Sequence, residues 1–344
     1  MNRPPSPLTM LLSRHTRRRE VLAAIGGISA LSPTALAQSA SKPPRIAFVH
    51  SGIPAAELTE SAGPFWVRRF LQELRRSGYI EGENLIVQRY SAEGHQERFT
   101  ALAREVVTSK PDLIVMNYNA LARAFQDATS TVPLVGIVAD PMRTGLVASL
   151  ARPGGNFTGV SVDAGVEIVG KRLQLLRELL PSSQRVAYLG APVDWNSPGG
   201  HGMRPAGSQL GLTVFGALSE EVGPPELRRM FDEVTRERAD AAVASAGGDF
   251  LAHRQLIVDL AAANRLPVMY AFRDFIEAGG LAAYGPDLGE AADRLASHVD
   301  QILKGARPGD VPVHQASKFA LLINGATAKA LGLSIPSTLI ARAD

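Results

Sequence analysis

The sequence predicts an α/β protein with two Rossmann-like lobes, each a parallel sheet with helices on both faces. Apolar segments of strand length alternate with segments of helical period, which is typical of parallel sheets covered on both sides. The strand pattern also occurs twice, in the same order. With 344 residues, 45% of them apolar, the chain is long enough to give each lobe a core of its own.

Three pairs of similar segments carry the internal repeat. Each pair joins an apolar run in the first half to one in the second: RIAFVH (45–50) with RVAYLG (185–190), KPDLIVM (110–116) with RADAAVA (238–244), and VPLVGI (132–137) with LPVMYA (266–271). A single pair could arise by chance, because many parallel-sheet proteins use such strands. Three pairs in one order favour two copies of one architecture.

Helices are expected between these strands. Apolar residues recur every three or four positions over 64–78, 97–110, 167–181 and 288–305. Further helices are expected over 120–128, 142–150 and 250–263. We interpret the aromatic and aliphatic stripes of these helices as core packing.

Two flexible stretches are expected to carry the chain between the lobes. Residues 135–138 are predicted as the last strand of the first lobe, Asp140 as the N-cap of helix 142–150, and 157–162 as an extended segment leading to the second lobe. The stretch 279–287 would carry the chain back. We therefore expect lobe 1 at 45–160 and roughly 286–316, lobe 2 at 161–285, and a C-terminal segment, 317–344, returning to the hinge or to lobe 2.

The first 37 residues resemble an export signal. They combine five arginines and one glutamate with a short apolar core and the small-residue ending Ala35-Leu36-Ala37. Arg18 and Arg19, followed by Glu20, Val21 and Leu22, resemble a twin-arginine motif, although the general export route stays open. The apolar stretch is too short to span a bilayer. We expect cleavage near Ala37 and a periplasmic protein.

Composition and motifs exclude several classes of protein. Outside residues 1–37 the chain carries 31 basic and 32 acidic residues, which argues against a nucleic-acid surface. It has no cysteine, which excludes disulfides, Cys–metal sites and a lipid-modified Cys that could anchor the mature protein. The seven histidines show no metal-binding spacing, and the common nucleotide-binding and hydrolase motifs are absent. We expect neither a cofactor, nor a bound metal, nor catalytic residues.

Long motifs resemble the substrate-binding proteins of ABC transporters with the type I periplasmic fold, in the branch that includes aromatic amino-acid binders. They are LRRSGYIEGENLIV (74–87), DPMRTGLVASLARPGGNFTGVS (140–161), KRLQLLRELLP (171–181), EAGGLAAYGPDL (277–288) and the segment from 303 to 344. The segment GAPVDWNSPGGHG (190–202) departs from the Asn-Pro-rich turn usual in this family.

The resemblance implies a protein that captures a small solute by hinge closure and delivers it to an ABC permease with a cytoplasmic ATPase. It implies a monomer that binds no nucleic acid. A hydrophilic cleft with a few aromatic residues suits an amino acid or related carboxylate; sugars and nucleosides are alternatives. A periplasmic sensor of the same fold that feeds a signalling receptor is a second hypothesis, and an α/β enzyme a remote one.

Candidate ligand-binding residues follow the carboxyl ends of the predicted strands, where ligands bind in open parallel sheets. They are Ser51, Asn117, Tyr118, Asn119, Asp140, Asp194, Trp195, Asp249, Phe272 and Tyr284. Each also has a structural interpretation. Ser51 could close a turn, Asn119, Asp140 and Asp249 could cap helices, Asp194 could be a solvated surface residue, and the aromatic residues could belong to the core.

Overall fold

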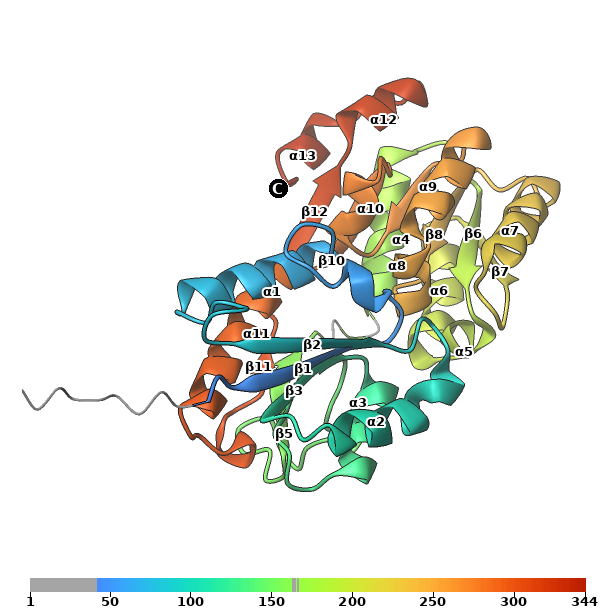
Figure 1. The fold of residues 1–344 in the computed structure, drawn as a ribbon. Helices are drawn as coiled ribbons and strands as arrows, with labels where there is room; N and C mark the ends of the chain where they lie inside the picture. The colour runs from blue at the N-terminus through green and yellow to red at the C-terminus, as the bar shows by residue number, and fades with distance from the viewer. Residues whose placement is uncertain (1–41, 163–164, 166) are drawn as a thin grey trace, which may run out of the picture. The chain divides into compact units, whose positions relative to one another are not determined.

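A computed structural model gives the structure of the protein and describes residues 42–162, 165 and 167–344 (Figure 1). The predicted export signal, with its cleavage site near Ala37, lies outside the described residues. Residues Pro43–Asp344 form one compact unit. Within the described part of the chain, no helix combines the length and the apolar character needed to cross a membrane.

The first sheet has six strands in the order β11-β5-β4-β3-β1-β2, and every neighbouring pair is parallel. Its strands are β1 (Arg45–His50), β2 (Ile86–Ser91), β3 (Leu113–Asn117), β4 (Leu134–Val138), β5 (Phe157–Ser161) and β11 (His314–Gln315). The middle strands β3 and β4 are apolar and buried, as expected for a sheet covered on both faces.

The second sheet repeats this plan in the order β12-β10-β9-β8-β6-β7. Its strands are β6 (Arg185–Gly190), β7 (Thr213–Leu218), β8 (Ala241–Ala244), β9 (Val268–Tyr270), β10 (Ala282–Pro286) and β12 (Phe319–Ile323). Only β12 runs antiparallel to its neighbour, β10. Strands β1, β3 and β4 hold the same places in the first sheet as β6, β8 and β9 hold in the second. The predicted repeat is therefore confirmed.

Helices cover both faces of each sheet. Those associated with the first sheet are α1 (Phe65–Arg76), α2 (Phe99–Thr108), α3 (Asn119–Ala128) and α11 (Leu288–Leu303). Those that follow in the second half are α4 (Glu167–Leu179), α5 (Pro192–Trp195), α6 (Pro198–Gln209), α7 (Pro224–Arg236), α8 (Gly248–Ala252), α9 (Arg254–Ala263), α10 (Arg273–Glu277), α12 (Gly325–Ala330) and α13 (Ser337–Ile340). Short 3-10 turns occupy Ala55–Glu57, Gln96–Arg98 and Pro308–Asp310.

Alternating residues of each central strand enter different cores. In β1, Ile46 and Phe48 pack in the core cluster that contains residues of α1 and α11, whereas Ala47 and Val49 pack with residues of α2 and α3. Figure 1 shows α1 and α11 on one side of this sheet and α2 and α3 on the other. This alternation follows from the two-residue period of a strand.

Three details of the predicted organisation are wrong. Residues 142–150 form turns instead of a helix, because Gly145 adopts a left-handed φ of 72° that interrupts a helical path. Strand β4 is not the last of the first sheet, since the buried run of β5 pairs with it and β11 pairs with β5. The predicted helix 250–263 is two helices, α8 and α9, which are separated at His253.

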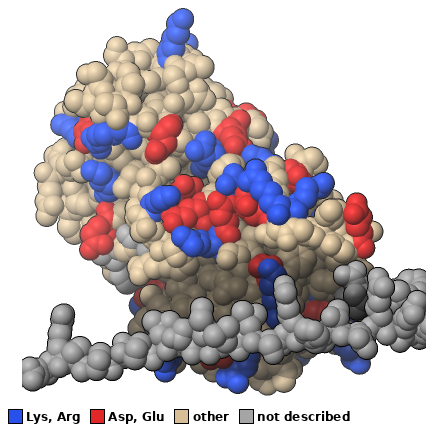
Figure 2. Space-filling view, turned by 90° about the vertical axis from the view of Figure 1, so that its left-hand side faces the viewer, with Lys and Arg blue, Asp and Glu red and all other residues tan. Residues whose placement is uncertain are grey.

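Charged residues of both signs lie side by side on the surface. Figure 2 shows Lys and Arg interspersed with Asp and Glu on one face of the molecule. Several form ion pairs, such as Arg69–Asp293 at 2.6 Å and Arg185–Glu237 at 3.0 Å. Exposed pairs of this kind contribute only about 0–1 kcal/mol each, so the buried cores dominate the stability of the fold.

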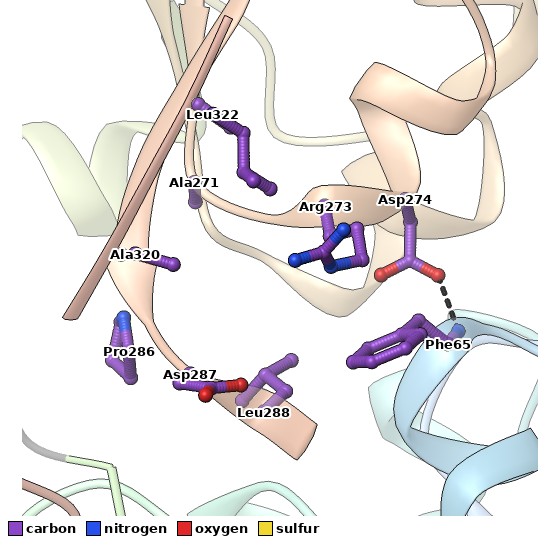
Figure 3. A pocket seen from close by; sticks show the side chains of 11 residues that line it. Phe65, Ala271, Arg273, Asp274, Pro286, Asp287, Leu288, Ala320 and Leu322 are labelled. Carbon is purple, nitrogen blue, oxygen red and sulfur yellow. Dashed lines mark hydrogen bonds between the residues drawn. The ribbon is translucent and has the colours of Figure 1, made fainter. Parts of the chain in front are cut away.

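The chain passes between the sheets three times: from β5 to β6, from β10 to β11, and from β11 to β12. Close to the last two crossings, the start of α1 contacts α10. The Phe65 N–H donates to Asp274 Oδ1 at 2.7 Å, and the Arg273 guanidinium lies 5.0 Å from the Phe65 ring centroid (Figure 3). Arg68 and Glu277 form an ion pair at 2.7 Å beside this contact.

The pairing of β4 with β5 depends on two opposed glycines, Gly136 and Gly159. Gly159 has a φ of 147°, and a Cβ atom at this position would lie 2.0 Å from the Gly136 carbonyl oxygen. A side chain therefore cannot fit without separating the two strands.

Gly159→Ala is expected to lower the free energy of unfolding by more than about 2 kcal/mol, because backbone atoms rather than a flexible side chain block the new methyl group. Urea unfolding followed by circular dichroism measures this change. Gly155→Ala is the matched control, since no atom lies within 4 Å of the place its Cβ would take. Equal stabilities of the two variants would contradict the role given to Gly159.

Asp274 makes the stability of the fold depend on pH. It is 3% exposed, and its Oδ2 atom has no hydrogen-bond partner among the described residues. Burial raises the pKa of the Asp274 carboxyl, which the hydrogen bond from Phe65 opposes and the charge of Glu277 reinforces. The folded state therefore holds this proton more tightly than the unfolded chain, whose Asp pKa is about 3.9.

The contribution of Asp274 to stability should fall as pH rises from about 3.9 through its raised folded-state pKa. We therefore expect the unfolding free energy of the wild type, minus that of Asp274→Asn, to decrease between pH 3 and pH 7. Urea unfolding of both proteins across this range tests the expectation. A difference that increases with pH would show that the folded state favours the charged carboxylate.

Candidate functional site

A cavity of about 410 Å³ is lined by residues that follow strands of both sheets. From the first sheet come residues after β3, β4 and β5; from the second come residues after β6, β8, β9 and β10, together with α4. The carboxyl ends of parallel strands meet here, as the sheet rule predicts. The volume lies within the usual range of small-molecule sites, roughly 300–1,000 Å³.

The first-sheet side of the cavity is held by paired polar side chains. Asn117 Oδ1 accepts a hydrogen bond from the Ser51 N–H at 2.9 Å, and Asn117 Nδ2 donates to Ser51 Oγ at 3.0 Å. Next to them, buried His50 accepts the N–H groups of Gly52 and Ile53 on Nδ1. Burial lowers the pKa of His50 to about 3, so the ring is neutral and fixes the loop that carries Ser51.

Asn119 is not the helix cap that its position predicts. It is the first residue of α3, and its Oδ1 accepts the Ala139 N–H at 2.8 Å while its Nδ2 donates to Thr144 Oγ1 at 3.1 Å. The side chain therefore ties the start of α3 to the loop after β4. Asp140 accepts the Arg143 N–H in the same loop at 2.9 Å, in a turn instead of the predicted helix.

Tyr118 is a strained residue at the mouth of the cavity. Its φ of 75° lies in the left-handed region, which is uncommon for an aromatic residue. Residues with strained backbones cluster at functional sites. The residue is 38% exposed, and its ring meets Phe99 edge-on at 6.1 Å. Partial burial and the charges of Asp194 and Asp249 raise the pKa of its phenol, so the phenol lies within electrostatic reach of the carboxylates that follow the second sheet.

The second-sheet side of the cavity carries an acidic group, Asp194, at its wall. Asp194 Oδ2 accepts from Ser245 Oγ at 2.9 Å, and Ser245 Oγ accepts from the Gly247 N–H at 3.0 Å. Asp249 lies nearby in the first turn of α8, where its Oδ1 accepts the Phe250 N–H. Burial raises the pKa of Asp249, and the charge of Asp194 adds to this shift.

A buried arginine, Arg172 of α4, also lines the cavity. It is 6% exposed, and its Nε donates to the Tyr284 carbonyl at 2.8 Å. Burial lowers the pKa of its guanidinium to about 10, which leaves it positively charged at neutral pH.

The remaining wall is apolar. It is formed by aliphatic and aromatic side chains from both halves of the chain: Trp66, Ile137, Val138, Val162, Ile168, Val169, Met203, Leu251, Phe272 and Leu288. Such a wall suits a flat or branched hydrophobic group, because burying apolar surface gives roughly 25 cal/mol per Å². In the described residues, no cluster of His, Asp or Glu could hold a metal ion.

The structure brings half of the predicted site residues to the cavity wall: Asn117, Tyr118, Asn119, Asp194 and Phe272. The others are Ser51, which supports Asn117; Asp140, in the loop after β4; Asp249, in α8; Trp195; and Tyr284. Trp195 is buried behind Tyr188, with ring centroids 5.6 Å apart, and Arg204 covers its ring. Tyr284 belongs to β10, where its ring stacks on Phe319 at 6.0 Å.

Cavity residues that the sequence analysis did not select include the polar and aromatic side chains of Trp66, Arg172, Tyr188 and Ser245. Arg172 had a recognisable signal, because it lies three, four and seven positions before Leu175, Leu176 and Leu179, on the buried face of α4. A charged side chain on the buried face of a helix is unusual and could have been noticed. Tyr188 had no such signal in the sequence, since an aromatic residue inside a strand usually belongs to the core.

Known proteins share this architecture. A tyrosine-binding protein from Clostridioides difficile (strain R20291) is 24% identical over 277 residues, which cover 77% of this chain and 75% of that protein. A conserved domain protein from Vibrio cholerae is 26% identical with a TM-score of 0.73, covering 88% of this chain and 99% of that one. An ABC domain from Streptococcus pneumonia, crystallised with L-Trp, shares the fold with a TM-score of 0.73 at 22% identity, over 87% and 98% of the chains.

The model of one protein family, described as ABC transporter substrate binding protein, matches residues 66–344. The match begins within α1 and covers the second sheet, every strand of the first sheet except β1, and the whole cavity wall. The chain therefore belongs to the family of ABC transporter substrate-binding proteins.

Proposed function

We propose that this substrate-binding protein captures an amino acid with an aromatic side chain in the cavity between its two sheets. The bound protein then delivers this solute to an ABC permease and its cytoplasmic ATPase. As a member of a family of binders, the protein supplies affinity and a change of shape rather than catalysis.

The cavity itself carries the proposal. It joins a charged, hydrogen-bonding wall around Asp194 and Ser245 to an extended apolar wall that includes Trp66 and Phe272. An ammonium group fits beside the Asp194 carboxylate, which lines the cavity. The aromatic side chain of the solute fits against the apolar wall, where ring contacts add to the burial of apolar area.

The ligands of relatives support the same class of solute. The relative from Clostridioides difficile is named for tyrosine, and the Streptococcus pneumonia domain was crystallised with L-Trp. Both ligands combine the ammonium and carboxylate groups of an amino acid with a flat ring. Of the predicted binding residues, we retain Asn117, Tyr118, Asn119, Asp194 and Phe272 as contacts, and Ser51 and Asp249 as supports of those contacts.

Closure of two lobes over the solute is the proposed mechanism. We take the first sheet with α1–α3 and α11 as one lobe and the second sheet with its helices as the other, joined by the three crossings. A solute that contacts both lobes stabilises the closed arrangement by its differential affinity for that state. In the structure the loop after β1 lies against the start of α8, since a Cβ on Gly52 would lie 2.7 Å from the Gly248 carbonyl oxygen.

We propose that the protein works in the periplasm. The proposal rests on the basic, twin-arginine-like residues 1–37, which we expect to be removed near Ala37 after export. We expect no binding of nucleic acid, because the chain outside this segment is nearly neutral. We also expect a monomer, as the family resemblance implies.

L-Tyrosine or L-tryptophan is expected to stabilise the purified protein. At a hundredfold excess over its Kd, either one should raise the free energy of unfolding by about 2.7 kcal/mol, because it binds only the folded state. Thermal unfolding with a panel of amino acids, sugars and nucleosides measures this effect. Stabilisation by sugars or nucleosides alone would overturn the proposed solute.

Asp194→Asn should weaken binding of the same amino acid. Loss of a charge-assisted hydrogen bond costs about 1.5–3 kcal/mol, which corresponds to roughly ten- to hundredfold in Kd. Isothermal titration calorimetry gives the two values. Asp232→Asn, an exposed aspartate on α7, is the matched control and should bind like the wild type. If Asp194→Asn binds as tightly as that control, the ammonium group lies elsewhere.

Gly52→Val should reduce affinity without a matching loss of stability, because the added side chain separates the loop after β1 from α8 and so opposes closure. We expect Kd to rise more than about tenfold, the cost of disfavouring the closed state by about 1.4 kcal/mol. Gly155→Val, in open space, is the control. An unchanged Kd for Gly52→Val would show that the contact between the loop after β1 and α8 does not contribute to closure.

A further inference from the structure

Among the described residues, no carboxylate pairs with the buried cation Arg172. Its Nε bonds to the Tyr284 carbonyl, which leaves two NH₂ groups of the guanidinium, and none of the ion pairs of the described chain includes it. The side chain is nevertheless 6% exposed and lines the cavity. Other arginines of the described chain pair with carboxylates at the surface, as Arg69 does with Asp293 and Arg89 with Glu81.

Burying such a cation is unfavourable. An ion that is removed from water without a partner loses favourable hydration that nothing in the protein replaces. The position on α4 would be filled at lower cost by another leucine, since Leu175, Leu176 and Leu179 lie on the same face of the helix. A buried, unpaired guanidinium at the wall of a ligand cavity therefore indicates that the negative partner arrives with the ligand.

Tyr188 places this cation near the acidic wall. Burial raises the pKa of the Tyr188 phenol, the charge of Asp194 raises it further, and the charge of Arg172 lowers it. Both charges thus act on one phenol, and all three residues line the cavity. A positive and a negative group within reach of one side chain match the adjacent carboxylate and ammonium groups of an α-amino acid.

We propose that Arg172 binds the carboxylate of the solute and thereby restricts the protein to carboxylate-bearing ligands. The planar guanidinium can donate two parallel hydrogen bonds to a carboxylate, which gives direction as well as attraction. A neutral sugar, an amine or an amide would leave the cation unpaired inside the closed cavity, and so would be rejected. This inference rests on the proposed cavity, but not on the presence of an ammonium group in the ligand.

A comparison of three ligands on three proteins tests it. The probes are L-tyrosine, L-tyrosinamide and 3-(4-hydroxyphenyl)propionate, titrated by calorimetry into the wild type, Arg172→Gln and Arg172→Lys. We expect the wild type to bind tyrosine at least about a hundredfold more tightly than tyrosinamide, as for a lost charged pair. In Arg172→Gln this ratio should fall below about ten, and Arg172→Lys should restore part of it.

The outcomes separate this inference from the proposed function. If Arg172→Gln weakens tyrosine and tyrosinamide by the same factor, Arg172 has only a structural role and the inference fails. If tyrosine binds the wild type and Arg172→Gln equally, the inference fails while the proposed function stands. If the propionate binds in an Arg172-dependent manner and tyrosine does not, the carboxylate site stands and the amino-acid proposal fails. Arg104→Gln, an exposed arginine on α2, is the matched control and should bind like the wild type.

Discussion

The parallel alignment of the strands is the constraint on which the rest of this molecule depends. In each sheet the strands that alternate with helices point the same way, so the loops after their carboxyl ends gather at one edge. Because the chain builds this arrangement twice and crosses between the copies, the two edges contribute to one cavity. Asn117 at the end of β3 and Ser245 after β8 occupy equivalent places and line the same space.

Some polar side chains at this edge form hydrogen bonds with the surrounding loops, whereas others keep groups that can still bind a solute. Asn119 lines the cavity and ties the start of α3 to the loop after β4, and His50 accepts two backbone N–H groups on Nδ1 and fixes the loop after β1. Arg172 and Asp194 keep hydrogen-bonding capacity that the described residues do not use. Because the protein already holds these groups in place, binding of the solute costs little free energy of reorganisation, and this favours affinity. The strained backbone of Tyr118 at the cavity mouth fits the same pattern.

Much of the fold could be predicted from the sequence because apolar runs and helical periods report burial directly. The strands at 45–50 and 185–190 are found at those residues, and the repeat of three segments corresponds to equivalent strands in the two sheets. The loop after β4 could not be predicted, because an Asp-Pro pair begins a turn as readily as a helix and only Gly145 decides between them. The edge strand β11 is two residues long and has no pattern of its own.

The site was less predictable than the fold for a physical reason. Position after a strand identifies the loops that face the cavity, and Asn117, Asp194 and Phe272 were found in this way. It does not say which way a side chain points, so Trp195 turned out to be core against Tyr188. Residues that reach the cavity from inside an element, such as Arg172 of α4 and Tyr188 of β6, follow no strand end.

A crystal structure of the protein grown with L-tyrosine tests the central claim most directly. The account predicts a single tyrosine enclosed by residues of both sheets, with its carboxylate within about 2.7–3.2 Å of the Arg172 guanidinium nitrogens and its ammonium beside the Asp194 carboxylate. A tyrosine bound outside this cavity, or seated on one sheet with its carboxylate in solvent, would contradict it.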